Sequence, residues 1–213
     1  ARNHPSVAIY GIGNECNTAH PEAKDFFAQL AQWLRSLDDT RLLSYAALYG
    51  IVGAIGEMVD VLGINSYWGW YDKVLDQKDL TAGRAWQEAD NMPKEPIDLT
   101  PMCKMLDEVI AGSRDDQVLF LTEFGADSVA GFYARSLDLW SENYHAALIQ
   151  EILKLSRAYP QIAGTFPFCF SDYRDPSKTP NGYWSELNLK GMVTYNRRKK
   201  LAFDALKQWY EQP

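Results

Sequence analysis

Short apolar runs alternate along this chain with longer segments in which apolar residues recur at helical spacing. The runs that read as strands cover 7–12, 41–47, 59–65, 118–121 and 162–170. The helical patterns cover 21–37, 101–111, 140–159 and 199–210. Alternation of strands and helices without hairpin signals is typical of parallel strands joined by right-handed crossovers. The sequence therefore predicts an α/β fold built on a parallel sheet.

Five parallel strands fit two architectures, an open doubly wound sheet or most of an eight-stranded TIM barrel. No Gly-rich phosphate-binding string follows any of the strands, and the loops after them are long and aromatic, which favours the (β/α)₈ barrel. The chain lacks an initiator Met and runs almost at once into a strand. We therefore expect residues 1–213 to be the C-terminal portion of a barrel, strands 4 to 8, incomplete in this chain and preceded by upstream domains of the same polypeptide.

Composition limits the classes of partner. With 46% hydrophobic and 23% charged residues, the chain has the make-up of a globular domain. A formal net charge of −7 argues against nucleic acid or an anionic membrane as partner, and no apolar run approaches the roughly 20 residues of a membrane span. Three cysteines without paired spacing favour a reducing compartment, and so a cytoplasmic location. A homo-oligomer is compatible with the sequence, which does not set the oligomeric state.

Two glutamates follow predicted strands, Glu15 after the first and Glu123 after the fourth. Functional groups of parallel α/β folds lie at the carboxyl ends of the strands. Cleavage of a glycoside needs one carboxylic acid to protonate the leaving oxygen and a second carboxylate at the reacting carbon, so this pair predicts a glycosidase. Asn14 reads either as a donor to a sugar hydroxyl or as a turn residue, and Asp60 and Asp127 as strand-entry and supporting groups.

The strings around the two glutamates resemble family 2 glycoside hydrolases, the group of β-galactosidases, β-mannosidases and β-glucuronidases. Asn3-His4-Pro5-Ser6-Val7 followed by Gly13-Asn14-Glu15 is similar to the fourth barrel strand of that family, and 122–131 to the strand that carries its nucleophile. The resemblance covers nearly the whole chain, from the fourth strand to the last helix. It implies that residues 1–213 are the C-terminal part of the catalytic TIM barrel. It implies retaining hydrolysis of a β-glycoside by double displacement, with Glu15 as acid/base, Glu123 as nucleophile, and no metal or organic cofactor.

Two further strings are similar to β-glucuronidases in particular. Asn65-x-Tyr67-x-Gly69-Trp70-Tyr71 resembles their sixth strand, which implies that Tyr67 lies beside the nucleophile and Tyr71 near the carboxylate of the sugar. Asn188 and Lys190 resemble the Asn-x-Lys pair that binds the C6 carboxylate, and a lysine charge with an amide donor suits that task. A neutral hexose would then leave the lysine unpaired in a desolvated pocket. The predicted partner is a small-molecule or oligosaccharide β-glycoside, and these strings favour a β-glucuronide.

The chain departs from β-glucuronidases at two positions. Phe168 stands where those enzymes usually have a Trp under the sugar, and Trp184 where an Arg near the sugar carboxylate is common. We expect weaker affinity for a uronic acid, or a related uronide as substrate. Two alternatives stay open: a β-galactosidase-like hydrolase of neutral sugars, and a catalytically inactive sugar-binding half-barrel.

Overall fold

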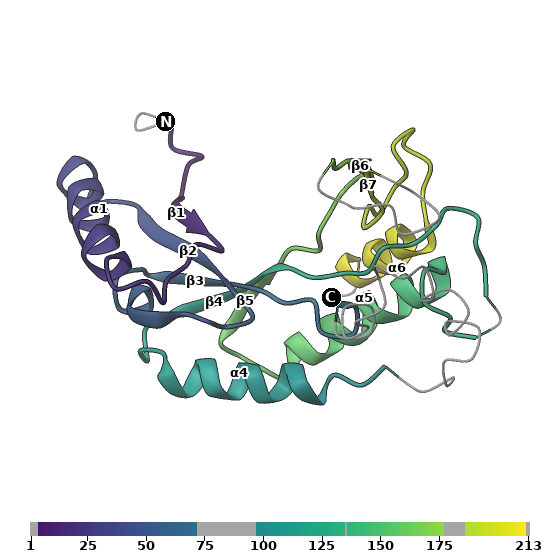
Figure 1. Cartoon of the computed structure of the whole chain (residues 1–213), viewed down its shortest axis with the longest axis horizontal. Helices are drawn as coiled ribbons and strands as arrows, with labels where there is room; N and C mark the ends of the chain where they lie inside the picture. The colour runs from purple at the N-terminus through teal and green to yellow at the C-terminus, as the bar shows by residue number, and fades with distance from the viewer. Residues whose placement is uncertain (1–3, 72–96, 135, 177–185, 212–213) are drawn as a thin grey trace. The chain divides into compact units, whose positions relative to one another are not determined.

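The computed structural model describes residues 4–71, 97–134, 136–176 and 186–211 (Figure 1). The chain divides into two compact units, each assembled from separate segments. The first unit comprises residues 1–66, 102–122 and 159–166, and the second comprises residues 67–101, 123–158 and 167–213. The polar, proline-containing stretch 72–100 predicts an irregular, lid-like loop, and all but its last few positions lie outside the described residues.

The first unit contains a five-stranded sheet in the order β1-β2-β3-β4-β5 (Figure 1). Only Glu123, the last residue of β4, belongs to the second unit. The strands are β1 Ile9–Asn14, β2 Leu42–Leu48, β3 Val61–Asn65, β4 Val118–Glu123 and β5 Ile162–Thr165. β1 pairs in parallel with β2, β2 with β3, and β4 with β5. A doubly wound sheet would reverse its strand order at a switch point, and this one does not. The prediction of part of a barrel is confirmed.

Two helices, one after β1 and one before β4, bury apolar residues at helical spacing. Helix α1, Ala23–Leu37, buries Phe27, whose ring meets that of Tyr45 on β2 edge-on at 5.6 Å between centres. Helix α4, Thr100–Gly112, buries Met102, Met105, Leu106 and Val109. Each such side chain contributes about 1.5–3 kcal/mol of burial free energy. A short 3-10 helix, η1 Gly53–Glu57, precedes β3.

The fifth strand is shorter than predicted. The apolar pattern indicates 162–170, whereas β5 ends at Thr165. The amide of Phe166 donates to the carbonyl of Leu121 at 2.7 Å and that of Phe168 to the carbonyl of Phe124 at 2.9 Å, so the chain stays bonded to the segment that begins with β4 although the regular pairing stops at Thr165. Half of the Phe166 side chain is exposed, as expected where a strand leaves its sheet.

The second unit contains two helices and a small hairpin. Helix α5, Glu142–Arg157, begins at Ser141, whose hydroxyl accepts from the amide of Tyr144 at 3.0 Å, a standard N-cap. Helix α6, Leu201–Tyr210, packs against α5 (Figure 1), and the guanidinium of Arg157 lies 3.8 Å from the centre of the Trp209 ring. Strands β6 Tyr173–Arg174 and β7 Leu187–Asn188 pair antiparallel. This hairpin was not predicted, because two residues a strand are too few for a pattern.

No helix in the described segments combines the length and apolar character needed to cross a bilayer. The three cysteines, all in described segments, carry free thiols. Burial, followed by the charge of Asp172, raises the pKa of the Cys169 thiol to about 11, so that this cysteine is not a nucleophile at neutral pH.

Candidate active site

Glu15 leaves the end of β1 at an irregularity in the sheet. Gly11 lies opposite Ser44 and Asn14 opposite Ala46, so β1 has one residue more than β2 in this interval, which is a β-bulge. The amide of Glu15 donates to the carbonyl of Ala46 at 2.9 Å, and its φ of +52° lies in the left-handed region. That conformation costs a residue with a side chain about 1 kcal/mol or more, and such strain concentrates at functional sites. The bulge and the turn direct an exposed carboxylate out of the ladder.

The carboxylate of Glu15 is held by Asn65, the last residue of β3. The Asn65 amide nitrogen donates to Glu15 Oε1 at 2.7 Å and to Asn14 Oδ1 at 3.0 Å, while its oxygen accepts from the Thr122 hydroxyl at 2.7 Å. Asn65 is fully buried, so these bonds form away from water and fix the amide in one orientation. The sequence predicts no role for Asn65, which appears there only as the first residue of the motif that contains Tyr67. An amide at the end of an otherwise apolar strand is the signal that could have drawn attention to it.

In the second unit, Glu123 is paired with Tyr67. The Tyr67 hydroxyl donates to Glu123 Oε2 at 2.6 Å, a charge-assisted bond between two residues 56 positions apart in the sequence. Gly125, two residues after Glu123, has a φ of +146°, and a Cβ there would lie 2.8 Å from the carbonyl oxygen of Phe168. The Thr-Glu-Phe-Gly string therefore needs its glycine, because a side chain would strain this backbone conformation and collide with the carbonyl oxygen.

Lys190 is buried among aromatic rings, and its charge is balanced by a carboxylate. Its ammonium forms an ion pair with Asp127 and donates to the Tyr71 hydroxyl at 3.0 Å. It also lies 4.6 Å from the centre of the Tyr71 ring and 5.5 Å from that of the Tyr67 ring. The expectation that a neutral sugar would leave this lysine unpaired is wrong, because Asp127 balances its charge. Asp127 had been assigned only a supporting role in general terms, and its partner 63 residues away gave no local signal.

Asn188 and Phe168 meet at Tyr173. The side-chain amide of Asn188 donates to the Tyr173 hydroxyl at 3.2 Å, and its oxygen accepts from the backbone amide of Lys190 at 3.2 Å. The Phe168 ring is half-buried, with its centre 6.2 Å from the Tyr173 ring and 6.5 Å from the Tyr67 ring. The peptide bond between Phe168 and Cys169 is cis. Trp184, the second departure noted in the sequence, lies outside the described residues.

A second buried lysine supports this region. Lys200, at the start of α6, pairs with Asp172 at 2.8 Å and donates to the carbonyls of Ser128 and Leu189, each at 2.8 Å. Burial raises the pKa of Asp172 and lowers that of Lys200, and each charge opposes the effect of burial on the other. Since Leu189 lies directly before Lys190, Lys200 anchors the loop that carries it.

A neutral histidine completes the buried cluster. His145 Nδ1 lies 3.0 Å from the Ser128 hydroxyl, and no hydrogen-bond partner for Nε2 occurs in the described segments. Burial first, and then the positive charge of Lys200, lowers the pKa of His145 to about 3. The ring is therefore uncharged at neutral pH.

Each unit thus brings part of the predicted set together. In the first, Asn14 and Glu15 share Asn65 as a partner. In the second, one connected group contains the remaining predicted residues, which are Tyr67, Tyr71, Glu123, Phe168, Asn188 and Lys190. Their catalytic and binding roles stay predictions. Among the described residues no three His, Cys, Asp or Glu side chains are grouped so as to hold a metal ion.

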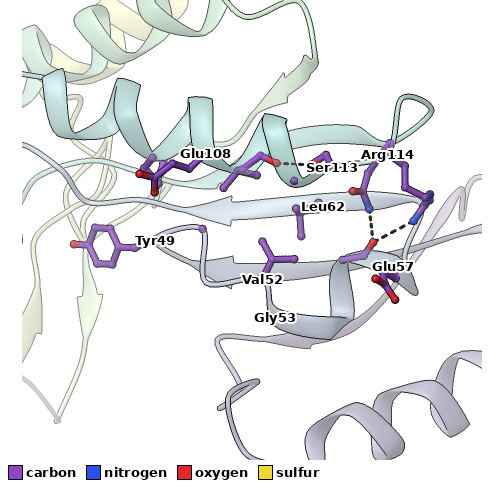
Figure 2. Close-up of a pocket in the computed structure, with 14 residues that line it drawn as sticks. Tyr49, Val52, Gly53, Glu57, Leu62, Glu108, Ser113 and Arg114 are labelled. Carbon is purple, nitrogen blue, oxygen red and sulfur yellow. Dashed lines mark hydrogen bonds between the residues drawn. The ribbon is translucent and has the colours of Figure 1, made fainter.

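A pocket of about 320 Å³ in the first unit contains none of the predicted site residues (Figure 2). It lies between α4 and the segment around η1, with Tyr49, Glu57 and Glu108 in its wall. Two side chains in the wall donate to the carbonyl of Gly56, Arg114 at 3.1 Å and Gln117 at 2.7 Å. These two donors are therefore bonded to the protein itself.

Residues 1–212 match the sequence profile described as "Glycosyl hydrolases family 2, TIM barrel domain". The chain belongs to this family. Among curated family 2 relatives, it is 25% identical over 214 residues to "Beta-glucuronidase" of Paenibacillus borealis, an alignment that covers 99% of the chain and 32% of the relative. The chain spans about a third of the length of the curated relatives it matches.

Solved family 2 structures superpose on nearly the whole chain. "Faecalibacterium prausnitzii Beta-glucuronidase" is 26% identical with a TM-score of 0.76, and the match covers 100% of this chain and 33% of that one. A GH2 β-galacturonidase from Eisenbergiella tayi bound to galacturonate is 24% identical with a TM-score of 0.77, over 98% of this chain and 34% of that one. At that identity the second likeness supports the fold alone, and it agrees with a partial family 2 barrel.

Proposed function

We propose that this chain is the C-terminal part of the catalytic barrel of a retaining β-glycosidase that hydrolyses β-glucuronides. Residues 1–213 would supply both catalytic carboxylates, and other domains of the same polypeptide would complete the enzyme. The names of the relatives at 25% and 26% identity support a glucuronide as substrate. Family membership supports the hydrolase chemistry.

One observation carries the proposal. Tyr67 bonds to Glu123 through its hydroxyl at 2.6 Å, and the ammonium of Lys190 lies 5.5 Å from the centre of the same ring. A single tyrosine thus separates a candidate nucleophile from a candidate carboxylate-binding cation. In a glucuronide the anomeric carbon and C5, which bears the C6 carboxylate, are both bonded to the ring oxygen, so a site for this substrate needs these two groups close together.

In the proposed mechanism Glu123 attacks the anomeric carbon and Glu15 protonates the departing aglycone oxygen. Glu15 then takes a proton from water, which hydrolyses the covalent glycosyl-enzyme. Tyr67 orients the attacking carboxylate, Asn65 orients Glu15, and Asn14 would bind the hydroxyl next to the anomeric carbon. Retention requires the two carboxyl groups to lie about 5–5.5 Å apart in the working enzyme.

At the other end of the sugar, Asn188, Lys190 and Tyr71 would bind the C6 carboxylate. Lys190 uses two of its three N–H groups on Tyr71 and Asp127, among the partners in the described segments. The third would be available for the substrate. Phe168 would form the apolar wall of the sugar site, with a smaller surface than a tryptophan.

Hydrolysis of 4-nitrophenyl β-D-glucuronide by the full-length protein, followed by its absorbance, tests the activity. Proton NMR of the first product tests the mechanism, since retention releases the β-anomer before mutarotation. A 2-fluoro glucuronyl fluoride should label Glu123, detectable by peptide mass spectrometry. Absence of turnover on every aryl glycoside, by the full-length protein and by the 213-residue chain, would leave only a sugar-binding role.

A neutral-sugar hydrolase of the same family is the second candidate. It is favoured by the Asp127–Lys190 ion pair, which removes the net positive charge expected of a uronate site. Comparing 4-nitrophenyl β-D-galactoside with the glucuronide separates the two. Lys190→Ala should impair the glucuronide far more than the galactoside if the first proposal is right.

A further inference from the structure

Asp127 is bonded to two consecutive residues of the loop that carries the Asn-x-Lys pair. Its Oδ1 accepts from the backbone amide of Leu189 at 2.8 Å, and its Oδ2 forms the ion pair with Lys190. The side chains of Lys190 and Asp127 are only 1% and 5% exposed. One carboxylate therefore both holds this loop in position and balances the charge of its lysine.

Both buried lysines behind the proposed sugar site already have a carboxylate partner. Lys190 is paired with Asp127 and Lys200 with Asp172, and His145 is neutral at pH 7. A further buried carboxylate, Glu142, accepts from the backbone amides of Gly131 and Leu201, so no cation here lacks a counter-charge among the described residues. In such an environment, an added charge without a partner is strongly unfavourable. A uronate would place a second carboxylate beside an ammonium that already has one, whereas a C6 hydroxymethyl group would add no charge.

We propose that Asp127 is a specificity-determining residue, which lowers the preference of this site for a C6 carboxylate over a C6 hydroxymethyl group by neutralising Lys190. The inference rests on the proposed glycosidase function and deepens it. The proposed effect is one of charge. Asp127→Asn tests charge separately from shape, because the asparagine keeps an oxygen for the amide of Leu189 while the negative charge is removed. Without that charge, Lys190 would prefer a substrate that brings its own carboxylate.

The test compares kcat/KM for 4-nitrophenyl β-D-glucuronide and 4-nitrophenyl β-D-glucoside, which differ only at C6. In the full-length protein, Asp127→Asn should raise the glucuronide-to-glucoside ratio by about tenfold or more, since juxtaposed like charges cost several kcal/mol. The change should lie in a lower KM for the glucuronide. Asp172→Asn is the matched control, because it removes an equally buried carboxylate that pairs with Lys200 instead. It should leave the ratio within about threefold of the wild type.

A ratio that is unchanged or lower in folded Asp127→Asn overturns the inference, as does an equal rise in Asp172→Asn. If Asp127→Asn does not fold, the double variant Lys190→Met with Asp127→Asn decides, since it leaves no buried charge unpaired. In this double variant, kcat/KM for the glucoside should not exceed that of the wild type. A tenfold rise would mean that Lys190 disfavours neutral sugars even when paired with Asp127, which overturns the inference. A wild type that hydrolyses neither substrate refutes the proposed function and this inference together. Turnover with no response to Asp127→Asn refutes only the inference.

Discussion

Asn65→Ala offers a sharp test of how Glu15 is positioned. The change removes both donors of the buried amide, at 2.7 Å from Glu15 and 3.0 Å from Asn14. A hydrogen bond to a charged group contributes about 1.5–3 kcal/mol. If that bond holds Glu15 where the leaving oxygen is protonated, kcat/KM should fall roughly 10- to 150-fold. This range lies at or near the lower end of the loss expected from removing a general acid altogether, about 10²–10⁴-fold.

The leaving group separates a positioning role from a merely structural one. Phenyl β-glucuronide has a poor leaving group that needs protonation, whereas 2,4-dinitrophenolate departs without it. Asn65→Ala should therefore reduce kcat/KM strongly for the phenyl substrate. For the dinitrophenyl substrate, kcat/KM should fall by less than about threefold. Thr122→Val is the control, because it removes the donor to Asn65 Oδ1 but keeps both Asn65 donors. Equal losses on the two substrates would refute the reasoning.

Three other variants test the second unit. Tyr67→Phe removes the hydroxyl that donates to the proposed nucleophile, so kcat/KM should fall roughly 10- to 150-fold on both leaving groups alike, measured with the same two substrates. The pKa of His145 is lowered to about 3, so between pH 6.5 and 3 the unfolded chain binds a proton that the folded protein does not. The free energy of unfolding should then fall by about 2 kcal/mol from neutral pH to pH 5, and His145→Gln should remove that part of the decrease in urea titrations; an unchanged pH dependence would contradict it. Lys200→Met leaves Asp172 buried without its cation and should lower the free energy of unfolding by about 3–5 kcal/mol, whereas Lys199→Met, at the exposed neighbouring position, should change it by less than about 0.5 kcal/mol.

Most of the sheet could be predicted because its strands are apolar runs closed by polar or glycine-containing segments. β2 was expected at 41–47 and is Leu42–Leu48, and β4 was expected at 118–121 and is Val118–Glu123. The helices follow from spacing in the same way, as for α4, expected at 101–111 and observed at Thr100–Gly112. The prediction for β5 was too long because the apolar run continues to Phe170, whereas the regular pairing with β4 stops at Thr165.

The side chains that support the site could not be predicted in the same way. Glu15 and Glu123 stand at strand ends, and position alone marks them. Asn65 and Asp127 act through partners 50 and 63 residues away, and such pairing leaves no trace in local composition. The same limitation misled the expectation about Lys190, whose charge could be judged only after its counter-ion was known.

The two buried ion pairs, Lys190 with Asp127 and Lys200 with Asp172, make this part of the fold respond unusually to heat. Hydration of charged groups becomes less favourable as temperature rises, so the penalty for burying these four charges shrinks on warming. The segment 188–191 should therefore loosen less between 25 and 50 °C than one held by neutral contacts alone. Amide hydrogen exchange across that interval would reveal it as retained protection at Leu189 and Gly191.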